Sequence, residues 1–166
     1  MRGWPRQLLA MNAATAGAKL WQSPPGGTGV SEPVVTADGR LFVQLQDGLV
    51  AWSADGAELW RHPGPRPRWF GWIGGPALAA DSVLYMVGQD AFYAIGTDGA
   101  LRWKTRTVTG DSAWFAGSSA IGPDGTVYTS AGTHVYALFG SHPPDRTAPW
   151  AMWRHDAHRT GWVPAN

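Results

Sequence analysis

The chain has 166 residues, no cysteine, and 13 basic against 12 acidic side chains. This length suits one ordinary domain, and the lack of cysteine excludes a disulfide framework and any Cys-based metal or redox site. A formal net charge of +1 gives no indication of a nucleic-acid partner, and the sequence has no apolar run long enough to span a membrane.

The composition indicates many short strands joined by turns. The chain contains 22 glycines and 13 prolines, well above average usage, whereas charged residues reach only 15%. Its 44% of apolar residues is not the composition of a disordered chain. The 11 tryptophans far exceed ordinary usage and need a cause.

The first expected elements are two short strands, near residues 8–10 and 18–21. Three fuller units then follow, over residues 31–61, 74–104 and 117–140. The N-terminal segment, residues 1–21, therefore contains only the last two strands of such a unit.

A repeat of 43 residues relates the three fuller units. Asp38, Asp81 and Asp124 stand 43 residues apart, and several apolar columns keep the same spacing. These columns are Phe42, Tyr85 and Tyr128; Ala51, Ala94 and Ala137; and Trp60 and Trp103. Ungapped agreement over so many columns indicates a structural repeat.

Each unit contains short apolar runs separated by turn residues. In the first, Asp38-Gly39 and Asp55-Gly56 predict hairpins, because type I′ turns need positive φ at both central positions. Runs such as residues 41–43 are apolar throughout, as expected for a sheet buried on both faces. A four-stranded antiparallel meander with this period predicts an all-β fold of β-propeller blades. A plain β-sandwich would explain the strands but not the repeat.

The unit ends resemble the repeat of pyrroloquinoline-quinone-like (PQQ-like) β-propellers, Ala-x-Asp-x-x-Thr-Gly-x-x-x-Trp. The matching segments are residues 10–21, 51–60 and 94–103. The first has Asn12 in place of Asp and one extra residue, and the other two replace Thr-Gly by Asp-Gly.

The resemblance implies that the tryptophan ending each segment docks its ring between adjacent blades. These docking tryptophans would be Trp21, Trp60 and Trp103. Small residues are expected where neighbouring sheets approach most closely, a place that suits Ala51, Ala94 and Ala137.

The C-terminal residues 150–161 resemble a segment of the form Trp-Pro-Met-Phe-x-x-Asp-x-x-x-Thr-Gly, which recurs at the ends of bacterial PQQ-like propellers. We expect residues 1–140 to form the blades and residues 141–166 to form a tail packed on the last blade.

About three and a half blades result, fewer than the four to eight of typical propellers. An unclosed arc would expose the apolar faces of its terminal blades. Three solutions exist: the chain is the C-terminal part of a longer protein, two chains complete a ring of seven or eight blades, or the tail acts as a cap.

The resemblance also raises the question of a cofactor. Family members that use PQQ surround it with Ca²⁺, acidic and amide side chains and a Trp platform, whereas Glu32 and Glu58 are the only glutamates of this chain. The sequence offers no cluster of the 6–8 oxygen ligands that Ca²⁺ takes. His155 and His158 in the polar tail suit a structural segment better than a metal site. We therefore predict no catalytic residue, metal or cofactor.

Two connections between units combine aromatic and basic residues. Residues 65–72 and 110–115 each follow a docking tryptophan and precede the next inner strand, near the mouth of a propeller's channel. Such side chains can bind a peptide, sugar or small ligand, although padding between blades would also explain the rings. The candidate contact residues are Arg66, Arg68, Trp69, Trp72 and Trp114.

These features predict a non-catalytic PQQ-like propeller module that acts as an interaction scaffold or ligand-binding platform. The alternatives are the C-terminal blades of a PQQ-dependent oxidoreductase, which would need PQQ and Ca²⁺, and an extracytoplasmic sensor domain. The resemblance implies a periplasmic or extracellular location, although residues 1–20 lack the apolar stretch of a secretory signal. The expected partners are a protein or small ligand, with missing blades from the same protein or a second copy of the chain.

Overall fold

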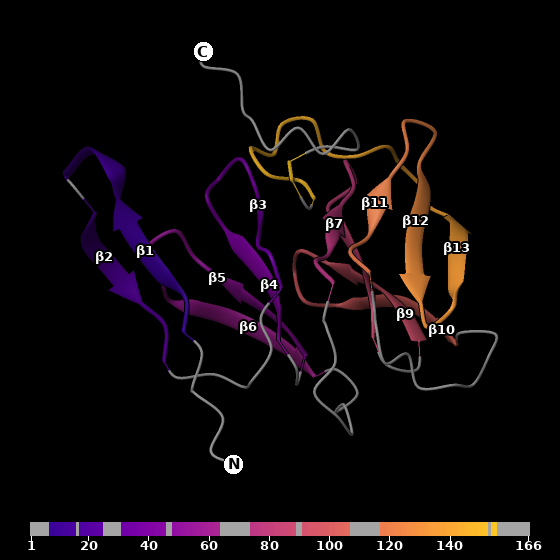
Figure 1. The fold of residues 1–166 in the computed structure, drawn as a ribbon, viewed down its shortest axis with the longest axis horizontal. Helices are drawn as coiled ribbons and strands as arrows, with labels where there is room; N and C mark the ends of the chain where they lie inside the picture. Colours follow the sequence, from indigo (N-terminus) through magenta and orange to yellow (C-terminus); the bar gives the residue numbers. More distant parts are fainter. Residues whose placement is uncertain are drawn as a thin grey trace.

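The computed structural model of the protein describes residues 7–15, 17–24, 31–45, 48–63, 74–88, 91–106, 117–152 and 154–155. These residues form four antiparallel sheets that lie side by side in chain order (Figure 1).

The sheets consist of an N-terminal pair of strands and three larger units. The N-terminal pair comprises β1 (Leu9–Asn12) and β2 (Ala18–Gln22), joined by the 3-10 helix η1 (Ala13–Thr15). Unit 1 comprises β3 (Val34–Val35), β4 (Leu41–Leu45), β5 (Gly48–Trp52) and β6 (Glu58–Pro63). Unit 2 comprises β7 (Ala77–Leu78), β8 (Val83–Val87), β9 (Ala91–Gly96) and β10 (Leu101–Arg106). Unit 3 comprises β11 (Ala120–Ile121), β12 (Thr126–Ala131) and β13 (His134–Phe139).

Strand order within every sheet follows chain order, as in a propeller blade. Units 1 and 2 are four-stranded meanders, β3-β4-β5-β6 and β7-β8-β9-β10, and unit 3 has the order β11-β12-β13. The prediction of an all-β protein made of partial propeller blades is confirmed. Within the described residues, unit 3 lacks the fourth strand that would pair with β13.

Aspartates at the turns explain why the chain reverses where it does. Asp98 Oδ1 accepts the backbone N–H of Ala100 at 3.0 Å, and Asp124 Oδ1 accepts that of Thr126 at 3.0 Å. A side-chain carboxylate that bonds its own backbone two residues later stabilises a turn locally. The Asp-Gly pairs thus end one strand and begin the next.

The hydrophobic core lies between the sheets, so units 1 and 2 are buried on both faces. We call the face that packs on the following unit the forward face, and the opposite one the back face. In unit 1 the forward face carries Phe42 and Leu49, which cluster with Leu84 and Ile95 on the back face of unit 2. Burial of a large apolar side chain such as Phe42 stabilises the fold by about 1.5–3 kcal/mol.

The same arrangement recurs one unit further along the chain. Tyr85 and Ala94 on the forward face of unit 2 cluster with Ile121 and Val127 of unit 3. Central strands buried on both faces account for their uninterrupted apolar runs.

The C-terminal tail crosses the first strands of the units. Trp150 pairs with Val35 of β3, and Pro144 pairs with Ala79 directly after β7. Leu78 of β7 donates its N–H to the Ala151 carbonyl at 2.8 Å. The tail was expected on the last blade; its described part runs beside the Gly125 turn of unit 3 and continues across units 2 and 1.

Candidate interaction site

Two of the tryptophans expected to dock between blades contact a turn of the following unit. Trp21 Nε1 donates to the Ala54 carbonyl at 2.9 Å, and Trp60 Nε1 donates to the Thr97 carbonyl at 3.0 Å. Ala54 and Thr97 occupy equivalent repeat positions, so the two indoles make the same contact with successive units.

Glycines in these turns leave room for the indole rings. Gly56 has φ +88°, and a Cβ there would lie 2.5 Å from Cδ2 of Trp21. Gly99 has φ +85°, and a Cβ there would lie 2.9 Å from Cδ2 of Trp60. Glycine is therefore favoured at both positions for two reasons. Its backbone adopts a positive φ without strain, and it has no Cβ to clash with the nearby ring.

The small side chain of alanine leaves room for each tryptophan ring to pack over the sheet to which it belongs. Ala51 pairs with both Phe42 and Trp60 in the sheet register. The rings of Phe42 and Trp60 approach to 5.7 Å between centroids, and in unit 2 those of Tyr85 and Trp103 approach to 5.9 Å. A larger side chain in place of the fully buried Ala51 would separate the two rings.

The third residue of each set, Ala137 and Trp103, has surroundings that differ from those of the first two. Trp103 packs against the core cluster between units 2 and 3, but the residue 43 positions after Gly99 is His142 rather than a turn glycine. Ala137 is exposed, whereas Ala94 is fully buried. The contact pattern of units 1 and 2 therefore changes at unit 3.

Polar contacts also link equivalent positions of successive units. The buried Gln44 donates from Nε2 to the Val87 carbonyl at 2.8 Å, and the two residues are 43 positions apart. The N–H of Gly75 donates to Ser118 Oγ at 3.0 Å over the same interval. The sequence repeat thus corresponds to a spatial repeat.

A small polar cluster fastens the start of the tail to unit 2. Ser141 Oγ donates to Asp81 Oδ2 at 2.6 Å, and His142 Nδ1 lies 3.0 Å from the same oxygen. Ser141 Oγ also lies 3.4 Å from the Tyr85 hydroxyl. Both Ser141 and His142 bond directly to the carboxylate, so no histidine lies between serine and aspartate as nucleophilic catalysis requires.

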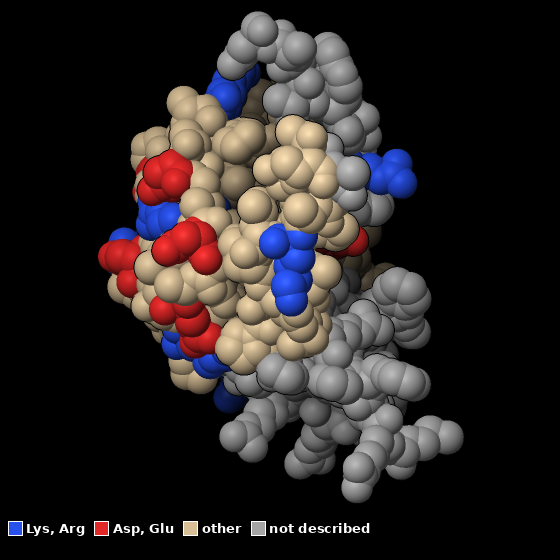
Figure 2. All heavy atoms as spheres, turned by 90° about the vertical axis from the view of Figure 1, so that its left-hand side faces the viewer, with Lys and Arg blue, Asp and Glu red and all other residues tan. Residues whose placement is uncertain are grey.

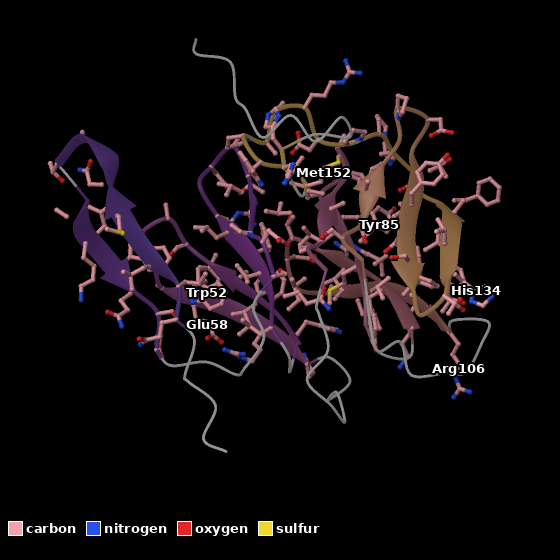
Figure 3. The ribbon with its side chains drawn as sticks, in the orientation of Figure 1. Trp52, Glu58, Tyr85, Arg106, His134 and Met152 are labelled. Carbon is pink, nitrogen blue, oxygen red and sulfur yellow. The ribbon has the colours of Figure 1, made fainter. Side chains whose placement is uncertain are left out.

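Beyond this cluster the tail inserts side chains between the units. Ala148 and Ala151 join the cluster of units 1 and 2, and Met152 joins that of units 2 and 3, to which Tyr85 also belongs (both labelled in Figure 3). Met152 is only 2% exposed. The tail is therefore part of the core. The sequence predicted a tail packed on the last blade, but not the insertion of its side chains between the units.

The five candidate contact residues lie outside the described residues. They are Arg66, Arg68, Trp69, Trp72 and Trp114. The ends of their loops are described: one loop connects β6 to β7, and the other connects β10 to β11. In a four-stranded meander the last strand ends on the side where the first begins, so both loops leave the same side of the sheets. Arg106, which ends β10, lies at the opposite side of the molecule from the tail residue Met152 (Figure 3).

Several charges on the described surface are paired locally. Arg40 Nε lies 2.8 Å from Asp38 Oδ2, and Arg102 Nη2 lies 2.9 Å from Asp98 Oδ2. Hydrogen bonds from the Ala100 N–H and the Arg102 side chain hold the pKa of Asp98 below its usual value, and bonds from the Thr126 N–H and hydroxyl do the same for the pKa of Asp124. These exposed carboxylates stay ionised and stabilise the turns by accepting backbone hydrogen bonds.

The described acidic residues do not fit a PQQ and Ca²⁺ site. Glu58 lies on the outer strand β6 and pairs with Arg61 at 2.9 Å, whereas Glu32 is exposed before the inner strand β3. The two glutamates therefore cannot contribute to one oxygen-rich shell. Within the described ranges, no three His, Asp or Glu side chains gather as a metal-binding group.

Comparison with known proteins identifies the family. The sequence profile of a family described as outer membrane protein assembly factor BamB matches residues 6–141. The chain belongs to this family. The match confirms the resemblance to PQQ-like propeller repeats that the tryptophan segments indicated.

A solved structure agrees with this BamB-like assignment at the level of the fold. The protein is similar to a β-propeller described as a streptogramin B lyase structure, with a TM-score of 0.55 and 17% sequence identity. The likeness covers 76% of this chain and 43% of the lyase chain. At this identity it shows the fold alone. No curated protein matches the sequence, and in the described part of the chain no helix is long and apolar enough to cross a membrane.

Proposed function

We propose that this BamB-like protein is a non-catalytic propeller module that serves as a rigid platform for a protein partner. The observation that carries the proposal is the match of residues 6–141 to a family of outer membrane protein assembly factors. Sheets joined through buried faces form a stiff support, and loops held by such a support are common binding sites.

The partner binds the loops that connect consecutive units. Arg66, Arg68 and Trp69 follow β6, and Trp114 precedes β11. Arg and Trp carry much of the binding energy at protein interfaces. Both loops leave the side of the sheets opposite the tail, which favours one continuous contact surface.

The docking tryptophans provide the stiffness that this platform needs. We assign this role to Trp21, Trp60 and Trp103, supported by the indole hydrogen bonds of the first two to Ala54 and Thr97 and by the packing of the third against unit 3.

Site-specific photo-crosslinking tests the binding surface. A photoreactive amino acid replaces Trp69 or Trp114 in the protein expressed in its native cells, and a matched control carries it at the exposed turn residue Asp55. We expect the two loop positions to crosslink to the same protein and the control to give no such product. The partner identified in this way is then purified.

Binding of the purified partner separates the loop surface from folding. The triple variant R66A/R68A/W69A should weaken binding at least about 30-fold, because arginine and tryptophan are typical interface anchors. Its thermal unfolding should match that of the unmodified protein. Unchanged affinity in a folded triple variant would show that these loops do not bind the partner.

We further propose an extracytoplasmic location, consistent with a family described as outer membrane protein assembly factors. Fractionation of native cells checks it: the protein should appear outside the cytoplasm, and recovery with cytoplasmic enzymes would contradict the assignment.

A further inference from the structure

The forward face of unit 3 carries exposed apolar side chains, and no sheet among the described residues packs on it. Tyr128 is 47% exposed, whereas its repeat equivalents Tyr85 and Phe42 are 3% and 0% exposed. In units 1 and 2 this position packs on the back face of the next unit. Unit 3 therefore has an aromatic residue, Tyr128, at the position that packs on the next sheet in units 1 and 2, but no described sheet covers it.

Exposure on this face is greatest along its outermost strand. Val135 and Phe139 of β13 lie on the same face as Tyr128, and they are 81% and 97% exposed. Adjacent exposed apolar side chains of this size mark an interaction surface on a soluble protein. We call Tyr128, Val135, Ala137 and Phe139 the forward end.

The N-terminal pair, at the other end of the row of sheets, exposes its back face, which is the kind of face on which a forward face packs. Leu9, Met11 and Leu20 of the N-terminal pair are 52%, 58% and 62% exposed. Leu9 and Met11 lie on the face away from Trp21, whose ring contacts unit 1, and Leu20 lies at the bulge of β2. Within the described residues no further sheet packs on this face, and we call these three residues the back end. Figure 2 views the molecule from this side, and uncharged residues make up much of the surface.

The two ends match in position as well as in chemistry. β13 is a third strand of its unit, and β1 and β2 correspond to the third and fourth strands of theirs. The most exposed part of the forward end would thus meet the outer strands that form the back end. Lys19, the register partner of Met11, donates from Nζ to Gln22 Oε1 at 3.2 Å, and its aliphatic stem can lie along an apolar surface.

We infer that two copies of this chain associate head to tail, with the forward end of each packed on the back end of the other. The interface continues the forward-to-back packing that the chain already contains between units 1 and 2 and between units 2 and 3. It is heterologous, because different surfaces of the two copies meet, and two such contacts close the assembly. This inference does not depend on the loop surface proposed for the partner.

Light scattering coupled to size-exclusion chromatography tests the assembly in the 166-residue protein. We expect a species of about twice 17.8 kDa. A forward-end variant, V135K/F139K, and a back-end variant, M11K/L20K, should each run as monomers, with association weakened at least about 30-fold because charge is placed in an apolar contact. All four positions are exposed within one chain, so folding should be preserved.

Mixing the two variants gives the deciding result. One chain then keeps an intact back end and the other an intact forward end, so a heterodimer with one good interface should form. A dimer made by either variant alone, or no heterodimer in the mixture, would overturn the head-to-tail pairing. A wild-type monomer up to the limit of solubility, or a series of higher multiples, would overturn the two-copy assembly. The loop variant R66A/R68A/W69A should remain dimeric, which separates this test from that of the proposed function.

Discussion

At the scale of single residues, the contact between an indole and a turn glycine relates one unit to the next. Trp21 meets Gly56 and Trp60 meets Gly99, each with a hydrogen bond from Nε1 to a backbone carbonyl close by. The Ala-x-Asp-x-x-Thr-Gly-x-x-x-Trp resemblance indicated which residues would be involved. It did not predict that each ring would lie over the glycine of the following unit, because sequence spacing does not give the angle between sheets.

Replacing a docking glycine tests that contact. We expect G99A to lower the free energy of unfolding by about 2–4 kcal/mol, because the left-handed backbone costs about 1–2 kcal/mol and displacement of the Trp60 ring adds a further overpacking cost. The matched control is G132A, where φ is +58° and nothing lies within 4 Å of a Cβ. Urea unfolding compares the two, and equal losses would show that the ring contact contributes nothing.

The turn aspartates predict a stability that depends on pH. Hydrogen bonds lower the pKa of four of them: from Thr36 for Asp38, from Ser53 for Asp55, from the Ala100 N–H for Asp98, and from the Thr126 N–H for Asp124. A carboxyl whose pKa is lower in the folded state stabilises the protein above its unfolded pKa of 3.8, and this contribution is lost as pH falls through the folded value.

Denaturation at different pH values checks this sign. The free energy of unfolding should decrease as the pH falls below about 5. The decrease should be smaller in D98N/D124N, because this variant removes two carboxyl groups whose pKa is lowered by folding and keeps an amide oxygen that can accept the turn hydrogen bonds. An identical acid dependence in the double variant would contradict the assignment.

At the scale of elements, the tail joins sheets that are distant in sequence. Met152 reaches the cluster between units 2 and 3, and Ala151 and Trp150 bond the inner strands β7 and β3. The sequence predicted a tail packed on the last blade but could not show that it turns back across the earlier ones, because the tail lies outside the repeat and no repeat column relates its residues to the sheets they contact.

Truncating the buried methionine tests the tail as part of the core. M152A should lower the free energy of unfolding by about 2–5 kcal/mol, the usual cost of removing a buried large side chain. The exposed L101A, which lies outside both proposed interface ends, is the control and should change the stability by less than about 0.5 kcal/mol. Thermal unfolding compares them, and an M152A protein as stable as L101A would mean that the tail does not hold the units together.

At the scale of the whole molecule, the 43-residue repeat predicted most of the fold. Alternation of Asp-Gly turns with short apolar runs located the strands. In units 1 and 2 the alanines of the repeat, Ala51 and Ala94, are fully buried and pair in register with Trp60 and Trp103. Ala137 differs because the element that would cover it is absent from the described part of unit 3. A sequence repeat indicates which residues each unit presents on its contact faces, but it does not indicate whether a neighbouring unit is present to cover them.

The most direct test of the account is a nuclear Overhauser measurement between units. Ring atoms of Trp60 lie close to the Gly99 backbone, and those of Trp21 lie close to Gly56. We predict strong cross-peaks between each indole and the Hα atoms of its glycine. Absence of both, in spectra that show the cross-strand contacts within β4, β5 and β6, would mean that the units fold but do not stack as successive blades.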